Sequence, residues 1–314
     1  MEAGIVNSAT DALLFIADEK GYFKEEGLDV DFTQFDSAAK MIAPLGSGQL
    51  DVGAGAPSAG FYNAVARDID VRIVADKGSL VENYDYMPIL VRTDLVESGQ
   101  VESVADLKGL RVAEPAEGTS TSATMAAVLE SEGLDYDDVD HQFVGFPEHV
   151  SSFENGAIDA AATTEPTAAT IVESGAAVRF FDSTEVYDGQ QLAVILYGGG
   201  FSSDRPAVAQ CFMNAYVKAS QDYNAAVADG DWEGEESTEI VDIISSAIGI
   251  DPELFRKTVP SFVAPDGAVN LESLERDYEF FKERGWLEAD VEADFDQLVD
   301  QTYTDQAAQS VNGS

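Results

Sequence analysis

The feature that most constrains the fold of this chain is a sequence pattern that occurs twice. EEGLDV at residues 25–30 is matched by SEGLDY at 131–136, and GQLDVGAGAP at 48–57 is matched by GAIDAAATTEP at 156–166. The two pairs keep their order and nearly the same separation, which chance matches among small residues seldom do. In each copy a glycine turn precedes a strand, and a loop with proline leads into the next helix. The chain is expected to contain two similar units.

Strand and helix candidates alternate in both halves. GIVN (4–7) precedes the helical ALLFIADEKGYF (12–23), and LRVAE (110–114) precedes TSATMAAVLESEG (121–133). Such alternation predicts parallel sheets with right-handed crossovers. From about Asp204 the pattern is helical almost to the end. The predicted fold class is α/β, with two doubly wound lobes joined by two crossover strands and followed by a C-terminal helical segment.

Two β-rich segments mark the passages between the lobes. MPILVRTD (87–94) enters the second lobe and LAVILYGGG (192–200) leaves it, and we expect the two to pair with each other. The glycine run 198–200 is either a hinge or a turn at a strand end. The predicted division is lobe 1 at 1–90, lobe 2 at 91–195, and a return to lobe 1 with the C-terminal helices at 196–314.

The charge excludes several kinds of partner. The chain has 59 Asp and Glu against 17 Lys and Arg, a formal net charge of -42, so nucleic acid and anionic membranes are poor partners. The acids are spread among aromatic and aliphatic residues, which indicates a folded protein with an acidic surface, adapted to salt. No apolar run is long enough to span a bilayer and no signal peptide is present, as expected for a trimmed mature chain.

Cysteine and histidine offer little metal or redox chemistry. The one cysteine, Cys211, lies in a helical apolar pattern and is predicted to be a buried small hydrophobe. His141 and His149 lie in a loop-rich region and are interpreted as surface or structural residues. We therefore predict no metal and no cofactor.

The loops after the predicted strands are the places for a ligand, because ligands of open parallel sheets bind beyond the carboxyl ends of the strands. They lie at 7–11, 55–58, 76–79, 117–121 and 163–166, and include the hydroxyl-rich turn of RVAEPAEGTSTSAT (111–124). GAGAPSAG lacks the dinucleotide spacing, and EGTSTS lacks the lysine of a phosphate loop. APSAG resembles a nucleophile elbow around Ser58, but both histidines precede residue 150 and a late triad histidine is missing.

Charged residues in these loops have two interpretations. Glu165 either accepts a hydrogen bond from an amine on a ligand or only favours a helix start, and the sequence does not separate the two. Asp11, Asp76 and Glu117 are expected to be solvated acids. Lys77 is the one basic residue in the loops, so ligand donors would be mainly backbone N–H and hydroxyl groups.

The chain resembles a known family in several places. ESVADLKGLRVAEPAEGTS is similar to the second-lobe opening of the type II solute-binding proteins of ABC importers, in the branch for nitrate, taurine, alkanesulfonates and thiamine-precursor pyrimidines. ADEKGYFKEEGLDVDF and LGSGQLDVG resemble first-lobe signatures of that branch, TTEP its E-P ligand loop, and NLESLERDYEFFKERGWL its late helical segment. Thr164 stands where the family often has an aromatic residue, so the ligand class is open.

The resemblance implies a non-enzymatic binding protein that closes around one small solute and hands it to a membrane permease. Sulfonate, taurine, nitrate and aminopyrimidine are the solute types, and an amine-bearing or zwitterionic solute is favoured if Glu165 contacts it. The protein would be an extracytoplasmic monomer, at the cell surface or in the periplasm, with a lipid anchor on a segment outside this sequence. The ligand-facing candidates carried over by position are Ser8, Thr10, Ala56, Ser58, Gly118, Thr119, Ser120, Thr164, Glu165 and Tyr197.

Two other classes share this fold. An enzyme of pyrimidine synthesis would carry a cysteine-rich motif and a reacting histidine, which are missing here, whereas a menaquinone-pathway enzyme is not separated by motif. A sensor's ligand-binding domain would need signalling segments. The binding protein is the favoured interpretation.

The acidic composition predicts that stability depends on salt. Thermal melts from low to multimolar KCl should show a rising midpoint, because salt screens repulsion among the surface carboxylates within a few Å. Equal concentrations of sucrose serve as the control for a general osmolyte effect. A midpoint that is unchanged by KCl would contradict the salt-adapted interpretation.

Overall fold

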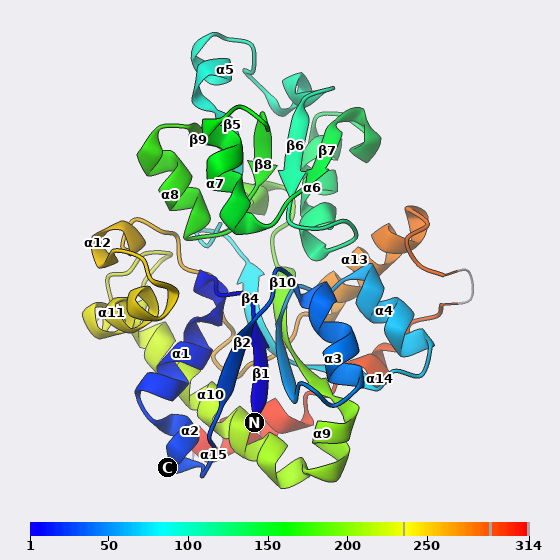
Figure 1. Cartoon of the computed structure of the whole chain (residues 1–314), viewed down its shortest axis with the longest axis vertical. Helices are drawn as coiled ribbons and strands as arrows, with labels where there is room; N and C mark the ends of the chain where they lie inside the picture. The colour runs from blue at the N-terminus through cyan, green and yellow to red at the C-terminus, as the bar shows by residue number, and fades with distance from the viewer. Residues whose placement is uncertain (235, 289–290, 313–314) are drawn as a thin grey trace.

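Each half of the chain builds a five-stranded sheet, and the two sheets lie in separate lobes (Figure 1). The structure is a computed structural model that describes residues 1–234, 236–288 and 291–312. The lobe 1 sheet contains β1 (Glu2–Ile5), β2 (Asp31–Gln34), β3 (Val52–Gly55), β4 (Val71–Leu80) and β10 (Gln190–Gly198). The lobe 2 sheet contains β5 (Ile89–Arg92), β6 (Arg111–Glu114), β7 (Asp140–Phe143), β8 (Ala160–Ala162) and β9 (Ala177–Phe181).

The two sheets have the same layout. Their strand orders are β2-β1-β3-β10-β4 and β7-β6-β8-β5-β9. β10 in one sheet and β5 in the other run antiparallel to both neighbours, while the remaining strands are parallel to one another. The matched glycines also agree, with φ of 76° and 75° at Gly27 and Gly133, and 71° at both Gly48 and Gly156. The repeat predicted from sequence is therefore a repeat of structure, and its glycines form left-handed turns that favour glycine.

Helices cover both faces of each sheet (Figure 1). Lobe 2 carries α5 (Thr93–Glu97), α6 (Ser120–Ser131), α7 (Phe146–Glu154) and α8 (Thr167–Ser174). Lobe 1 carries α1 (Ala12–Glu19), α2 (Tyr22–Glu25), α3 (Ile42–Gly46), α4 (Ala59–Ala66), α9 (Gly199–Asp204), α10 (Pro206–Ala226), α11 (Ser237–Ile248), α12 (Pro252–Phe255), α13 (Leu271–Glu283), α14 (Phe295–Leu298) and α15 (Thr302–Asn312). Short 3-10 helices lie at Ala9–Asp11, Ala38–Met41, Val104–Leu107, Tyr136–Asp138 and Ser183–Glu185.

The strands bury side chains on both faces, which explains their near-continuous apolar sequences. In β10, Val194 and Leu196 pack with the cluster beneath α3, α4 and α13, whereas Ile195 and Tyr197 pack with the cluster beneath α1 and α10. The strands of lobe 2 divide between two clusters in the same alternating way. The doubly wound prediction is confirmed for both lobes.

The chain passes between the lobes twice, from β4 to β5 through residues 81–88 and from β9 to β10 through 182–189. The expected pairing of the entering and leaving strands with each other is wrong, because β5 and β10 lie in different sheets. Each is the reversed strand of its own sheet. The two crossings are adjacent instead at their lobe 1 ends, where Gln190 pairs with Leu80. The predicted lobe limits at 90 and 195 fall inside β5 and β10, and the division of the chain stays a prediction.

Several single-residue expectations change. Cys211 is partly exposed on α10, because it lies on the rim of the apolar stripe of that helix. His149 is fully buried and bonds the Val144 carbonyl at 2.9 Å, so it is structural. The run at 198–200 ends β10 and begins α9, and a Cβ at Gly198 would lie 2.8 Å from the Leu45 carbonyl oxygen. The turn interpretation of this run is therefore the one that the structure supports.

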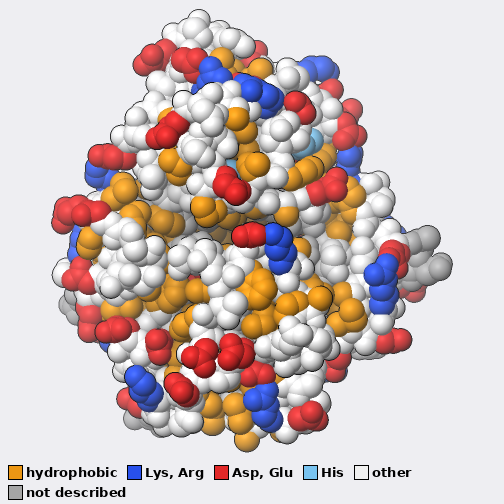
Figure 2. All heavy atoms as spheres, viewed as in Figure 1, with side chains coloured by type: hydrophobic (Ala, Val, Ile, Leu, Met, Phe, Trp, Pro, Cys, Tyr) orange, Lys and Arg blue, Asp and Glu red, His pale blue; other side chains and the backbone are white. Residues whose placement is uncertain are grey.

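The acids are distributed over the surface of both lobes (Figure 2). Within the residues that the structure describes, no helix is both long and apolar enough to cross a membrane.

A buried polar network lies beside the crossings and joins the lobes. Gln190 donates to the Ser120 carbonyl at 2.9 Å and accepts from Thr124 Oγ1 at 2.6 Å, so it bonds α6 of lobe 2. It also contacts Asp277 of α13 at 3.3 Å, and the Tyr187 hydroxyl donates to Asp277 at 2.7 Å. Burial raises the pKa of Asp277 to about 7, against hydrogen bonds from Tyr187, Ser120 and Gln190 that favour the charged form.

The raised pKa of Asp277 predicts a stability that falls as pH rises. Between the unfolded pKa and the folded pKa the native state binds more protons, so the free energy of unfolding decreases with pH over that window. Between pH 5 and 8, the free energy of unfolding should therefore fall less for Asp277→Asn than for the parent. The difference is at most about 3 kcal/mol, at about 1.4 kcal/mol per pKa unit. Urea melts at each pH measure this. Glu283→Gln, exposed on the same helix, is the control, and equal pH slopes for both variants would contradict the assignment.

Candidate functional site

A small cavity lies between the lobes, at the carboxyl ends of strands from both sheets. Its volume is about 50 Å³. Five of the predicted ligand-facing residues line it, namely Ser8, Thr10, Ala56, Thr119 and Thr164. Its apolar wall includes Val6, Ala38, Met87, Pro115, Phe146 and Leu192. The repeat places these loops opposite one another, since equivalent strand ends of two similar lobes face a common gap.

A buried ion pair forms the lobe 1 side of the cavity. Lys77, in β4, lines the cavity and places Nζ 2.9 Å from Asp11 Oδ1. The same Nζ donates to Thr10 Oγ1 at 2.7 Å. The Lys77 and Asp11 side chains are 1% and 0% exposed, and Asp11 Oδ2 accepts from the Ser8 backbone N–H at 2.9 Å. The expectation that Asp11 is a solvated acid is wrong, because it neutralises a buried lysine.

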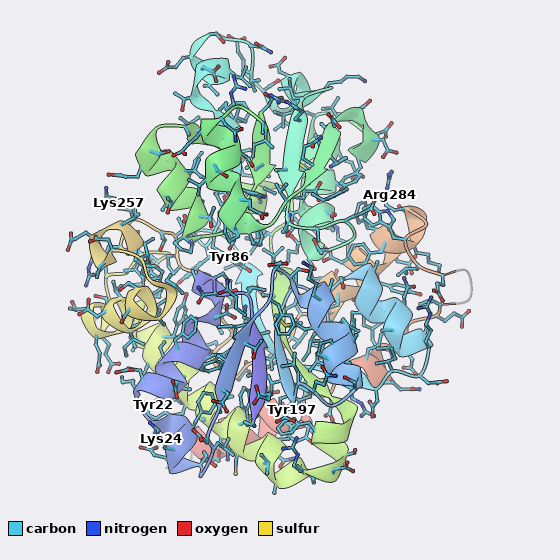
Figure 3. All side chains as sticks on the ribbon, in the orientation of Figure 1. Tyr22, Lys24, Tyr86, Tyr197, Lys257 and Arg284 are labelled. Atoms are coloured by element: carbon cyan, nitrogen blue, oxygen red, sulfur yellow. The ribbon has the colours of Figure 1, made fainter. Side chains whose placement is uncertain are left out.

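Tyr86 is a cavity residue that the sequence did not single out. It lies in the first crossing, between the lobes (Figure 3), and lines the cavity while only 1% exposed. Its hydroxyl has no hydrogen-bond partner among the described residues. A buried hydroxyl without a partner is costly, and it is explained if a ligand supplies the partner. The crossing MPILVRTD was recognised in sequence, but nothing there indicated that the tyrosine just before it faces the gap.

The cavity continues into a wider mouth of about 240 Å³. Val6, Ser8, Asp36, Phe146 and Thr164 border both. Among the described lining residues of the cavity and mouth, the charged ones are Lys77, Asp36 and Glu148. The carboxylates beside the cavity are therefore Asp36, which pairs with Lys40, and Glu148.

Backbone hydrogen bonds close the lobes on one another beside the cavity. The Ala59 N–H donates to the Gly118 carbonyl at 2.8 Å, and the Ser120 N–H donates to the Pro57 carbonyl at 3.2 Å. Ser58 and Thr119 form a β-bridge between these bonds. We call this set the lobe contact. It engages three predicted ligand residues, Ser58, Gly118 and Ser120, in holding the lobes together, and these three do not line the cavity.

The side chains of Ser58 and Ser120 are also occupied. Ser58 Oγ accepts from the Phe61 N–H at 3.2 Å and caps α4. Ser120 Oγ lies 3.4 Å from the Pro57 carbonyl. The hydroxyl-rich turn of residues 117–121 is thus mainly a helix start and a lobe contact, with Thr119 and Thr121 facing the cavity.

Glu165 is a structural residue of lobe 2. Its side chain is fully buried, forms an ion pair with Arg179 and accepts from the Ala169 N–H at 2.9 Å, inside the start of α8. Burial raises its pKa, and Arg179 opposes that shift. Glu165 does not line the cavity. The helix-start interpretation therefore holds, and the carboxylate is not free for a ligand amine.

Tyr197 was predicted to face the ligand, but it does not line the cavity. It is fully buried near the end of β10 in the lobe 1 core, away from the gap between the lobes (Figure 3). Its hydroxyl donates to the Ala209 carbonyl at 2.8 Å. β10 runs antiparallel to its neighbours, so its carboxyl end points away from the cavity while its first residues approach it.

Of the other two loop acids, Asp76 and Glu117, only Asp76 differs from the expectation of a solvated side chain. Asp76 is buried and accepts from the Ala264 N–H at 2.7 Å and from Gln191 and Ser79, so it organises the end of β4. Burial raises its pKa to about 6. The expectation of a solvated acid is wrong for Asp76, whereas Glu117 is exposed as expected.

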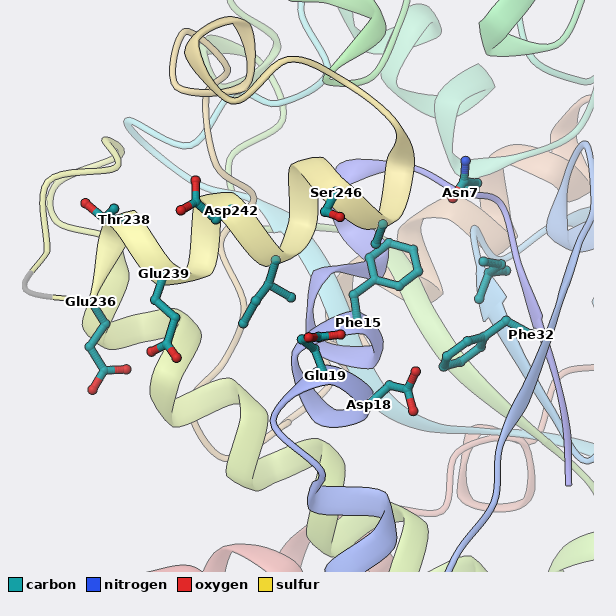
Figure 4. A pocket seen from close by; sticks show the side chains of 13 residues that line it. Asn7, Phe15, Asp18, Glu19, Phe32, Glu236, Thr238, Glu239, Asp242 and Ser246 are labelled. Atoms are coloured by element: carbon teal, nitrogen blue, oxygen red, sulfur yellow. The ribbon is translucent and has the colours of Figure 1, made fainter.

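A larger groove lies on lobe 1 beside α1 and α11 (Figure 4). Five acids line it, namely Asp18, Glu19, Glu236, Glu239 and Asp242, together with Phe15 and Phe32. Glu239 is 61% exposed, and Lys20 lies 3.4 Å from it. These are solvated surface charges. Within the part of the chain that the structure describes, no cluster of His, Cys, Asp and Glu could hold a metal ion.

Comparison with known proteins assigns the family. Residues 9–226 match the family described as NMT1/THI5 like. The chain belongs to this family. A binding protein of Brucella abortus (strain 2308) is 31% identical over 158 residues, which cover 50% of this chain and 45% of that protein. The taurine-binding periplasmic protein of Escherichia coli K12 is 24% identical over 205 residues, covering 65% and 60%. The chain spans about half the length of the curated relatives it matches.

Solved structures show the same fold as this member of the NMT1/THI5-like family. The alkanesulfonate-binding protein SsuA of Xanthomonas axonopodis pv. citri, bound to MOPS, has a TM-score of 0.73 at 17% identity, covering 93% of this chain and 95% of that one. The periplasmic nitrate-binding protein NrtA of Synechocystis PCC 6803 has a TM-score of 0.77 at 16% identity, covering 100% and 89%. The predicted fold class, two lobes of the periplasmic-binding type, is confirmed.

The lobe contact predicts a specific need for glycine at position 118. Gly118 has φ of 68°, and a Cβ there would meet Ala59 Cβ at 3.3 Å and the Trp286 ring at 3.5 Å. Gly118→Ala should push the lobes apart, which small-angle scattering detects as a larger radius of gyration. Gly133→Ala is a matched control, since φ is 75° and nothing lies within 4 Å of its Cβ. Both variants carry a backbone cost of about 1 kcal/mol. Equal scattering profiles would contradict a role for this contact.

Proposed function

We propose that this protein is a solute-binding component of an ABC importer, which encloses one small solute between its lobes and hands it to a membrane permease. The observation that carries the proposal is the cavity between the two sheets, lined by hydroxyls, a buried lysine and a tyrosine hydroxyl that has no hydrogen-bond partner among the described residues. The family match and the shared fold with sulfonate- and nitrate-binding proteins support it. The proposed location is extracytoplasmic, with a monomer tethered through a lipid anchor on a preceding segment.

The lobes close because the solute binds the closed arrangement more tightly than the open one. A ligand in the cavity contacts loops of both lobes, so it interacts more strongly with the closed arrangement than with an open one. A difference of about 5 kcal/mol moves a two-state equilibrium from mostly open to mostly closed. The lobe contact adds backbone hydrogen bonds that form only when the lobes meet.

The solute is small. A cavity water occupies about 10–15 Å³ by the same measure, so the cavity holds roughly four waters' volume in this lobe arrangement. We propose sulfonate, taurine, nitrate and aminopyrimidine types as the range to test. The preference for an amine-bearing solute loses its support, because Glu165 is paired with Arg179.

An enzyme is the competing class. The desulfurization enzyme DSZB has the same fold, with a TM-score of 0.65 at 15% identity, covering 99% of both chains. No histidine or cysteine is among the described residues that line the cavity, and Lys77 is held by Asp11. The described lining of the cavity thus lacks the Ser–His and Cys–His pairs of many hydrolases, which favours binding.

Blocking the cavity should abolish binding. Taurine, methanesulfonate, nitrate and 4-aminopyrimidine are titrated by calorimetry in 2 M KCl, and at least one should bind. Ala56→Phe places a ring at the cavity wall and should weaken that binding at least tenfold. Ala66→Phe, on the exposed end of α4, is the matched control. Equal binding by parent and Ala56→Phe would contradict the location of the site.

A further inference from the structure

We infer that the solute carries no net negative charge, and that Lys77 and Tyr86 recognise an uncharged hydrogen-bonding edge of it. The inference rests on the proposed function, because it concerns the solute of the same cavity. It separates this chain from proteins of the same fold that hold sulfonate or nitrate.

The first argument is the charge balance of the cavity. Lys77 is the one cation among its described lining residues, and Asp11 lies 2.9 Å from the ammonium. Both side chains are excluded from solvent. An anion placed beside this pair would meet a compensated charge, and burying an uncompensated anion is strongly unfavourable. The mouth adds the carboxylate of Glu148, which disfavours an entering anion, whereas Asp36, which lines both spaces, is paired with Lys40.

The second argument is that four N–H groups at helix starts facing the gap already have protein acceptors. The Ala59 N–H of α4 and the Ser120 N–H of α6 are engaged in the lobe contact. The Ala169 N–H of α8 donates to the Glu165 carboxylate, and the Ala9 N–H donates to the Glu165 carbonyl at 3.3 Å. A helix N-terminus binds an anion through such N–H groups. These four N–H groups are therefore not available to an oxyanion in this lobe arrangement.

The groups left for recognition suit an uncharged solute. Lys77 Nζ donates to Thr10 Oγ1 and forms an ion pair with Asp11, and an ammonium has three N–H donors, so a donor remains for a ligand acceptor. The Tyr86 hydroxyl is buried with no partner among the described residues. Met87, Leu192 and Phe146 offer apolar surface beside these groups. An amide, a sulfonamide or a ring nitrogen meets this pattern, with an apolar body against the wall.

Two pairs of probes, matched in shape but different in net charge, measure the effect of solute charge on affinity. Methanesulfonamide is compared with methanesulfonate, and urea with nitrate, by calorimetry in 2 M KCl. The parent protein should bind the uncharged member of at least one pair at least tenfold more tightly. Tyr86→Phe should weaken that binding several-fold without lowering the thermal midpoint, since the hydroxyl has no partner to lose in the part of the chain that the structure describes.

Asp11→Asn should increase the affinity for an anion, which would not happen if the role of Asp11 were merely structural. It leaves Lys77 uncompensated and keeps an oxygen to accept from the Ser8 N–H. The affinity for methanesulfonate should rise at least tenfold over the parent. Asp29→Asn, an exposed change of the same type that lies outside the cavity and mouth linings, is the control and should change it far less.

The outcomes separate the two proposals. Tighter binding of methanesulfonate than of methanesulfonamide by the parent, or an Asp11→Asn variant that is folded and gains no affinity for the sulfonate, would overturn the charge inference and leave the proposed function standing. Absence of binding by all four probes to both parent and Asp11→Asn would overturn the cavity as a solute site, and with it the proposed function.

Discussion

The architecture depends on the antiparallel pairing of β4 with β10. These strands are the points where the chain leaves lobe 1 and returns to it, and Leu80 and Gln190 lie opposite each other at their lobe 2 ends. Because the two exits are hydrogen-bonded neighbours, the second lobe is attached at one place, and its loops meet those of lobe 1 over the same edge. The Gln190 network beside this pairing ties α6 and α13 to the attachment, so the attachment is itself a packed and hydrogen-bonded element.

The lobe contact and the cavity are adjacent but use different atoms. Backbone groups of residues 57–59 and 118–120 hold the lobes together, whereas side chains from β4, the first crossing and the loop ends line the cavity. The contact engages the N–H groups that begin α4 and α6, and this leaves the cavity with hydroxyls, one tyrosine and a neutralised lysine. Closure thus determines the electrostatic character of the space that it encloses.

The sequence predicted the fold well because periodicity and the repeat are local signals. The matched glycines at 27 and 133 mark the same left-handed turn in both lobes. The predicted loop at 76–79 was wrong, because these residues lie inside β4. The site was predicted less well, because it depends on partners distant in sequence. The sequence around Glu165 did not indicate that Arg179 would pair with it. The Lys77–Asp11 pair joins two predicted loops that were each interpreted alone. Tyr197 was misplaced because the reversed direction of β10 was not anticipated.

The burial of the Lys77–Asp11 pair has a consequence for a protein with so acidic a surface. Mobile ions attenuate interactions between exposed charges over about 10 Å at 0.1 M and about 3 Å at 1 M, but reach buried pairs far less. The surface carboxylates and the pair at the cavity therefore respond to different parts of the environment. Ionic strength sets how strongly the exterior repels itself, while the recognition chemistry inside keeps the same local field in brine as in dilute buffer.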